Sequence, residues 1–207
     1  GGIMNCGYSS EGDNGLVTIE DCNVIETNIN RLGTEEEDVA HYGNHTNDCC
    51  VGGIAGSIQD MNVVTIKNVN VIGKNIAKDA ANANERNTIS VQYGDVGGAV
   101  GMTRNNTLKI SNVVIKNYDI INNVSEHKNY NQQSQIGGAF GSVWYGGNQA
   151  ELYKDITIEN VNIKGNKTIN TAGFAASFFT YDDSLIDNVN VRYTSISSEY
   201  TYHGEDS

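Results

Sequence analysis

The sequence of 207 residues carries a net charge of −12, contains 23 glycines and contains no proline. This excess of carboxylates disfavours nucleic acid or an anionic membrane surface as partner, because both select Lys and Arg. No apolar run approaches the roughly 20 residues of a membrane-spanning helix, so we expect no membrane insertion by this segment. Without proline, turns must rely on glycine and asparagine, and such a composition favours many short strands.

A glycine-rich hexamer recurs along the chain. It reads VGGIAG from Val51, VGGAVG from Val96, IGGAFG from Ile136 and TAGFAA from Thr171, and Gly1-Gly2-Ile3 matches a truncated first copy. Such repetition predicts one stack of repeats in which each repeat covers the apolar face of its neighbour. We therefore expect a single domain over residues 1–207, with repeats at about 1–50, 51–95, 96–135, 136–170 and 171–207. Because the sequence begins inside a repeat, we expect it to be a segment of a larger protein.

A strand-like segment follows each hexamer. The five copies are TIEDCNV, TIKNVNV, KISNVVI, TIENVNI and LIDNVNV, and their alignment forms an isoleucine column: Ile19, Ile66, Ile110, Ile158 and Ile186. Two residues later lies a polar column: Asp21, Asn68, Asn112, Asn160 and Asn188. The apolar alternation shifts by one residue across this column, which predicts a bend in left-handed backbone conformation.

Stacked bends would align the polar column into a structural ladder of hydrogen-bonded side chains, at the strand spacing of about 4.8 Å. The alternative is that each Asn caps an irregular loop. If the ladder forms, replacing Asn112 by leucine should destabilise the fold more than the same change at Asn117, which we expect to be exposed.

These repeats resemble those of right-handed parallel β-helix proteins, whose coils turn on an internal asparagine ladder. The GG-x-x-G hexamers are similar to the GLUG-type repeats of bacterial surface and adhesin-like proteins. The resemblance implies an all-β fold, a right-handed parallel β-helix (solenoid) of about five coils. The longest loops, about 31–50, 77–95 and 122–135, are expected to leave from one corner and lie on one side. They could form a ligand surface or be tolerated insertions.

All four cysteines lie near the N-terminus: Cys6, Cys22, Cys49 and Cys50. An even number of cysteines in one repeat predicts at least one disulfide and an oxidising, extracellular setting, with three pairings open. Cys22 stands in an inward valine column, so it could instead be a buried thiol. No Cys/His spacing of a metal site is present, and we predict no metal and no cofactor.

Many β-helix proteins cleave acidic polysaccharides, so the resemblance also raises an enzymatic site as an alternative. Such a site needs carboxylates that converge on one strand face. The outward column beside the isoleucines has mixed chemistry, and we expect only its last two members to form an acidic pair: Glu20, Lys67, Ser111, Glu159 and Asp187. This pattern is typical of a solvated face, so we predict that the chain is not an enzyme.

Aromatic residues gather in the last two repeats. Aligned from the hexamer, Trp144 and Phe179 share a column with Gln59 and Arg104, and Tyr145 and Tyr181 lie nearby. Aromatic platforms with polar tips serve both sugar-binding surfaces and protein interfaces. We predict ligand binding by Trp144, Tyr145, Phe179 and Tyr181, and assign Phe174 and Phe178 to capping the core.

Taken together, these features predict an extracellular or cell-surface module that is not an enzyme and is adhesin-like or fibre-forming. Its expected partner is a glycan or protein of a host or neighbouring cell, or further copies of itself. The alternatives are a β-helix enzyme of the polysaccharide lyase or glycoside hydrolase type, and a purely structural stalk spacer.

Overall fold

The computed structural model is an all-β structure, described for residues 1–8, 15–31, 50–77, 79–92, 94–123, 134–146, 150–166, 170–179 and 184–199. Within these residues the only helix is η2 (Ala83–Glu85), a single 3-10 turn. Neighbouring strands run parallel throughout the described sheets. The predicted all-β, parallel-strand fold is thus confirmed.

The strands form four sets, which we name sheets A to D. Sheet A holds β1 (Met4–Tyr8), β6 (Ala55–Gln59), the first half of β10 (Val100–Lys116), β13 (Phe140–Gly146) and β17 (Ala175–Phe179). Sheet B holds β2 (Leu16–Glu20), β3 (Asn23–Ile25), β7 (Val63–Ile72), the second half of β10, β14 (Glu151–Glu159) and β18 (Ser184–Arg192). Sheet C holds β4 (Ile29–Arg31), β8 (Asn87–Val91), β11 (Tyr118–Asn123), β15 (Asn162–Asn166) and β19 (Ser195–Glu199). Sheet D holds β5 (Val51–Gly52), β9 (Val96–Gly97), β12 (Gln135–Gly137) and β16 (Asn170–Ala172).

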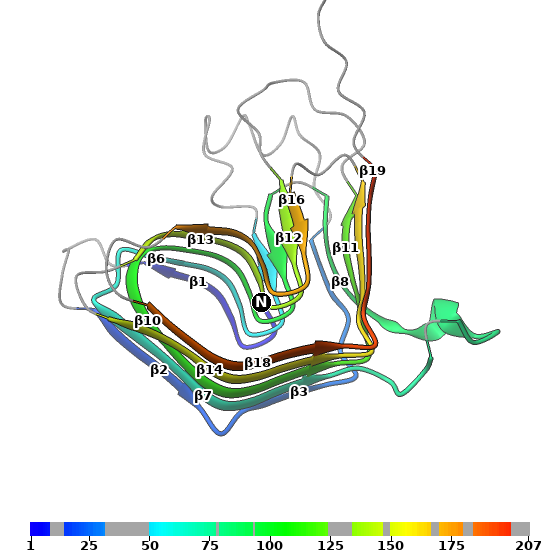
Figure 1. Cartoon of the computed structure of the whole chain (residues 1–207), viewed down its shortest axis with the longest axis horizontal. Helices are drawn as coiled ribbons and strands as arrows, with labels where there is room; N and C mark the ends of the chain where they lie inside the picture. The colour runs from blue at the N-terminus through cyan, green and yellow to red at the C-terminus, as the bar shows by residue number, and fades with distance from the viewer. Residues whose placement is uncertain are drawn as a thin grey trace, which may run out of the picture.

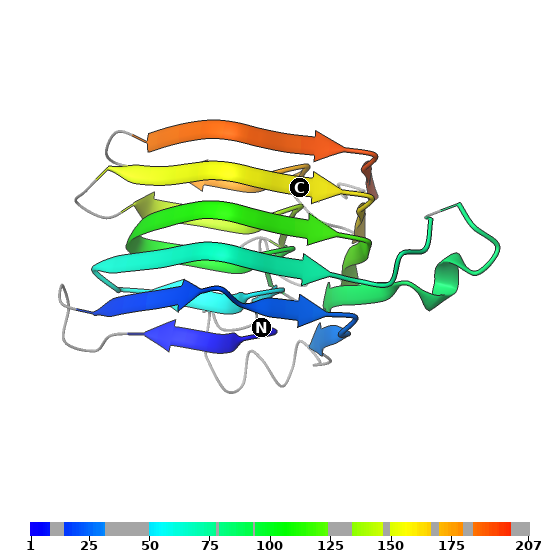
Figure 2. The same cartoon turned by 90° about the horizontal axis from the view of Figure 1, so that it is seen from below.

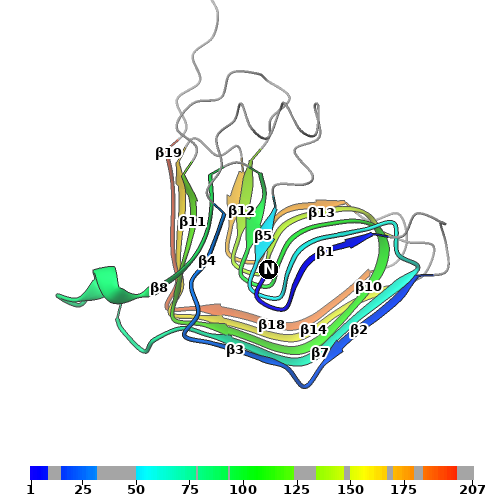
Figure 3. The same ribbon diagram turned by 180° about the vertical axis from the view of Figure 1, so that it is seen from behind.

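The chain visits these sheets in a fixed order, from D through A and B to C, before it returns to D (Figure 1). We call one such circuit a pass. Each pass lies beside the previous one, as the parallel strands of sheet B show in Figure 2. Figure 3 shows the same order from behind. The arrangement is compatible with a β-helix.

The glycines of the hexamer let consecutive passes approach closely between sheets D and A. A Cβ atom at Gly53 would collide with the carbonyl oxygen of Gly98, and one at Gly98 would collide with that of Gly138. The repeated glycine is therefore a consequence of backbone packing between passes.

The core lies between the sheets and is lined by the predicted apolar columns. In β7, Val64 and Ile66 are buried before Asn68, whereas Val69 and Val71 are buried after it. Asn68 has a φ of 54°, which produces the bend that lets both halves of the strand face inward. The predicted bend is confirmed in this repeat.

The predicted register of the fourth repeat is wrong. Val113 pairs with Ile156, so Asp155, not Asn160, lies in the polar column beside Asn112. Asp155 has a φ of 52° and makes the bend itself. The sequence alignment matched the letters NVN, whereas the fold aligns inward apolar side chains, with Tyr153 beside Ile110 where the alignment placed Ile158.

The predicted position of the long loops on one side is wrong for the second loop. Residues 77–95 contain η2 and strand β8, so they are not one loop. The long excursion of this pass covers residues 73–86 and leaves between sheets B and C, where it projects beyond β8 (Figure 1). The first and third long loops connect sheet C to sheet D, and residues 32–49 and 124–133 lie outside the described residues.

Candidate ligand-binding surface

The outer face of sheet A carries a column of flat side chains, one from each of four consecutive passes. Paired registers align one residue each of β6, β10, β13 and β17: Gln59, Arg104, Trp144 and Phe179. The preceding residues Ile58 and Val143 belong to the core, so strand alternation turns this column outward. We call these four residues the planar column.

Two members of the planar column form an aromatic stack. The rings of Trp144 and Phe179 lie 5.2 Å apart, with an angle of 26° between their planes. Phe179 is 53% exposed, Trp144 and Arg104 are half-buried, and Gln59 is buried. The column is therefore most accessible at the last pass.

Arg104 belongs to the strand next to this stack. Among the described residues its side chain makes no ion pair and no hydrogen bond, and its Nε atom is buried without a partner. On its other side, Gln59 donates a hydrogen bond from Nε2 to Ser57 Oγ at 2.8 Å. The planar column thus combines an aromatic platform with a guanidinium group that no acid of the described residues neutralises.

The structure brings together only part of the predicted site. Trp144 and Phe179 stack as expected from their common column, whereas the side chain of Tyr145 and all of Tyr181 lie outside the described residues. The prediction left Arg104 and Gln59 out of the site because it selected for aromatic character alone. Their shared column was the signal that could have included them.

Phe174 and Phe178 pack inward, in agreement with their assignment to the core. Phe178 lies 5.1 Å from Tyr153 and Phe174 lies 5.4 Å from Phe140, both measured between ring centroids in edge-to-face geometry. Phe178 precedes Phe179 in β17 and therefore points to the opposite face of sheet A, and both inner rings pack against the core behind the planar column.

The acidic pair considered for catalysis does not form. Glu159 contacts Lys116 and Arg192, each at 3.0 Å, whereas Asp187 lies 3.6 Å from Lys154. The hydrogen bond from Lys116 lowers the pKa of Glu159, and Arg192 adds to this effect. Lys154 therefore occupies the place that the sequence alignment assigned to Glu159, for the reason given above for the fourth repeat.

Two other carboxylates are buried, and nothing in the repeat pattern distinguishes them. Asp95 accepts hydrogen bonds from Ser142 Oγ and, at 3.0 Å, from the backbone N–H of Gln135. Burial raises its pKa to about 7. Glu151 accepts a hydrogen bond from the hydroxyl of Tyr153 at 3.1 Å, and burial raises the pKa of that tyrosine.

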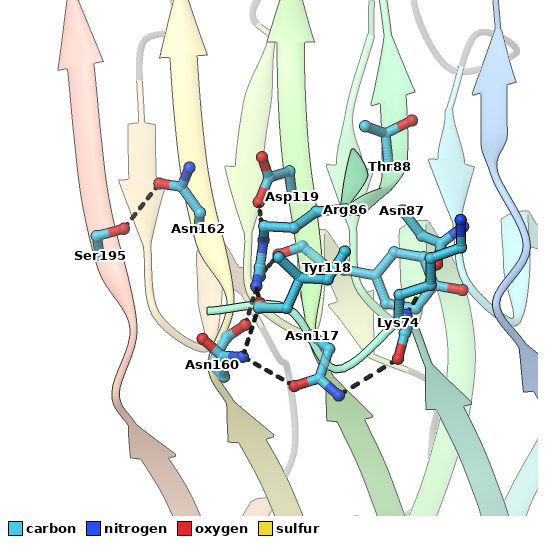
Figure 4. A network of polar contacts seen from close by, with 12 residues as sticks. Lys74, Arg86, Asn87, Thr88, Asn117, Tyr118, Asp119, Asn160, Asn162 and Ser195 are labelled. Carbon is cyan, nitrogen blue, oxygen red and sulfur yellow. Dashed lines mark hydrogen bonds and ion pairs between the residues drawn. The ribbon is translucent and has the colours of Figure 1, made fainter. Parts of the chain in front are cut away.

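A buried arginine organises the corner between sheets B and C (Figure 4). Arg86 Nε lies 2.7 Å from Asp119 Oδ1, and its other nitrogens donate to the carbonyl oxygens of Ile76, Tyr118 and Asn160. It thereby ties the 73–86 excursion to strands of the next two passes. We regard this as a structural network, because its polar atoms form hydrogen bonds with one another.

Cys22 forms no disulfide and donates its thiol to the carbonyl oxygen of Glu20 at 3.1 Å. Cys22 is half-buried and packs against the core, so the alternative of a buried thiol in the valine column holds in part. Cys50 is buried, while Cys49 and the side chain of Cys6 lie outside the described residues, so a disulfide among these three stays a prediction.

The part of the chain that the structure describes contains no group of three or more His, Cys, Asp or Glu residues arranged to hold a metal ion. Nor does any helix in it have the length and apolarity to cross a membrane. No protein-family model, curated protein or solved structure matches the chain. The planar column is therefore the feature of the described structure that best indicates a function.

Proposed function

We propose that the chain is a right-handed parallel β-helix of about five coils that serves as an extracellular, non-enzymatic, adhesin-like module. It resembles the GLUG-type repeats of bacterial surface proteins, and it binds a glycan or protein through the planar column. The observation that carries the proposal is the partly exposed Trp144–Phe179 stack on the outer face of a rigid sheet. Such a stack offers a flat apolar surface suited to the C–H face of a sugar ring.

The surroundings of the stack support this function. The inner aromatics Phe174 and Phe178 hold the strands from the core side. A binding surface on paired strands is preorganised, so little conformational entropy is lost when a ligand binds. Trp144 and Phe179 therefore meet the requirement for a rigid binding platform.

Glycan-array and cell-binding assays on the isolated protein test the proposal. The double change Trp144→Ala and Phe179→Ala should reduce binding at least about tenfold, as expected when central aromatic anchors are truncated. Tyr193→Ala is the matched control, because Tyr193 is 75% exposed but follows sheet B at another corner. If binding survives the double change, or falls equally in the control, the planar column is not the binding site. A circular dichroism spectrum unchanged from wild type shows that the fold is intact.

A fibre-forming role is the second candidate, favoured by the last pass. Ile186, Val191 and Ile196 are between 41% and 50% exposed, although their column neighbours Tyr153, Ile158 and Ile163 are fully buried. Exposed apolar columns beside unpaired strand edges favour stacking of a further layer. Ile196→Lys should then lower the association of the protein in sedimentation equilibrium, and unchanged association would remove this candidate.

A further inference from the structure

We infer that the planar column binds a sugar that carries a carboxylate, with Arg104 as the residue that pairs with the acid group. This inference rests on the proposed function, because it names the substrate class of the same surface. Arg104 and Trp144 are register partners on paired strands, which lie about 4.8 Å apart. A sugar ring stacked on Trp144 and Phe179 would therefore present its substituents to the guanidinium group.

The buried, unpartnered Nε atom distinguishes Arg104 among the described basic side chains. Several others lie against acids, as in the pairs Lys67–Glu20 and Arg86–Asp119. Arg104 has no such partner there, and its buried Nε lacks even a neutral acceptor. A buried donor without a partner destabilises the free protein, so an incoming anion that accepts from it offsets this cost.

The chemistry of guanidinium selects the acid group. Its planar fork of N–H donors matches a carboxylate in two parallel hydrogen bonds. The register partners of Arg104 are Trp144 on one neighbouring strand and Gln59 on the other, so flat side chains flank it along the column. Arg104 is half-buried, and the exposed part of its side chain is the place for the acid.

The net charge of the chain further restricts which acidic sugars can bind. At a net charge of −12, densely charged polyanions such as heavily sulfated glycans are repelled at long range. Asp60, next to Gln59 in the chain, adds local negative charge where it accepts a hydrogen bond from Asn105 at 2.7 Å. A ligand with one isolated carboxylate, as in a terminal uronic or sialic acid, satisfies Arg104 with the least repulsion.

Calorimetric titration of the whole chain with matched oligosaccharides tests this inference. The probes are a glucuronic-acid-terminated sugar, its glucose-terminated counterpart, a sialic-acid-terminated sugar and a sulfated sugar. Wild type should bind at least one of the two carboxylate-bearing sugars about tenfold or more tighter than the neutral one, as expected for a charge-assisted pair. Arg104→Gln should remove this preference and leave the weak binding of the neutral sugar unchanged.

The controls separate this inference from the proposed function. Lys154→Gln removes an exposed cation of sheet B and should leave the preference intact. Arg104→Lys keeps the charge but loses the fork, so it should retain only part of the preference. Retention of the full preference in Arg104→Gln, or tighter binding of the sulfated sugar, would overturn the carboxylate assignment while the aromatic site stands. Absence of any sugar binding by wild type would overturn both.

Discussion

Two bends of the chain use asparagine in the same backbone conformation but in different surroundings. Asn112, in the middle of sheet B, has a φ of 52°, and Asn117, at the corner before sheet C, has a φ of 61°. Asn112 is exposed and donates to Asn68 Oδ1 at 2.9 Å. Asn117 is half-buried beside the network of Arg86, where it accepts from Asn160 Nδ2 at 2.9 Å (Figure 4).

The polar column of sheet B is therefore an outer ladder and not the internal one that the resemblance implied. Its hydrogen bonds run from each amide to the preceding pass, from Asn68 to Asp21 and from Asn188 to Asp155. A carboxylate only accepts, so Asp155 cannot donate to Asn112 and the ladder starts anew there. Because water competes for such exposed bonds, the outer ladder stabilises mainly through backbone conformation.

The second ladder, at the corner between sheets B and C, was not predicted. Asn160, assigned by the sequence to the first ladder, belongs here, since Lys116 pairs with Glu159 and the next residues are Asn117 and Asn160. Asn117 in turn donates to the carbonyl oxygen of Gly73 at 3.3 Å. We therefore expect asparagine to contribute more to stability at the corner, where the excursion and Arg86 exclude water, than in the exposed bend.

The largest expected effect tests the buried corner itself. Arg86→Met should lower the free energy of unfolding by about 3–5 kcal/mol, because it removes a buried donor from Asp119 and from three carbonyl oxygens. The side chain of Arg86 is only 1% exposed, so water cannot replace it. Urea denaturation measures the change.

The matched control is Lys67→Met, which removes the exposed pair with Glu20 and should destabilise the fold far less, because water and salt screen that pair. Equal losses in the two variants would contradict the contrast between buried and exposed polar groups.

A second buried group, Asp95, should make stability depend on pH. Its carboxyl has a pKa of about 7 in the folded chain and near 4 when unfolded, so the folded state binds more protons between these values. The free energy of unfolding should therefore fall by a few kcal/mol as the pH rises from about 4 to about 7. Each unit of difference between the folded and unfolded pKa corresponds to about 1.4 kcal/mol.

Asp95→Asn should remove this component, because the amide can accept from Gln135 N–H and donate to Ser142 Oγ. Urea denaturation of both proteins at pH 5 and pH 8 measures it. Parallel pH profiles of wild type and variant would argue against a buried, protonated Asp95.

The smallest expected effect compares the two ladders directly. Glycine adopts positive φ without strain, so Asn112→Gly and Asn117→Gly isolate the contribution of each side chain. Asn117→Gly should cost about 1–2 kcal/mol more than Asn112→Gly, because it leaves Asn160 Nδ2 and the Gly73 carbonyl with fewer partners. This reverses the order that the sequence predicted for these two positions. Thermal unfolding of both variants checks it, and a larger loss at Asn112 would restore the internal-ladder interpretation.

The sequence by itself determined the features that depend on local period and backbone conformation. Alternation before Asn68 and its shift afterwards predicted both the inward columns and the bend, because strand geometry has a strict period of two. Repetition of the hexamer predicted a stack of repeats, and the common column of Trp144 and Phe179 predicted their contact.

Only the tertiary structure decided which residues lie side by side across passes. The register of the fourth repeat follows from the burial of Tyr153, Ile156 and Ile158 in the shared core. The sequence match NVN around Asn160 indicates a different register. Arg86 and Asp95 owe their roles to groups 33 to 74 residues away, and no local pattern encodes such contacts. Polar groups become structural or functional through what surrounds them, and in this chain the surroundings come from neighbouring passes.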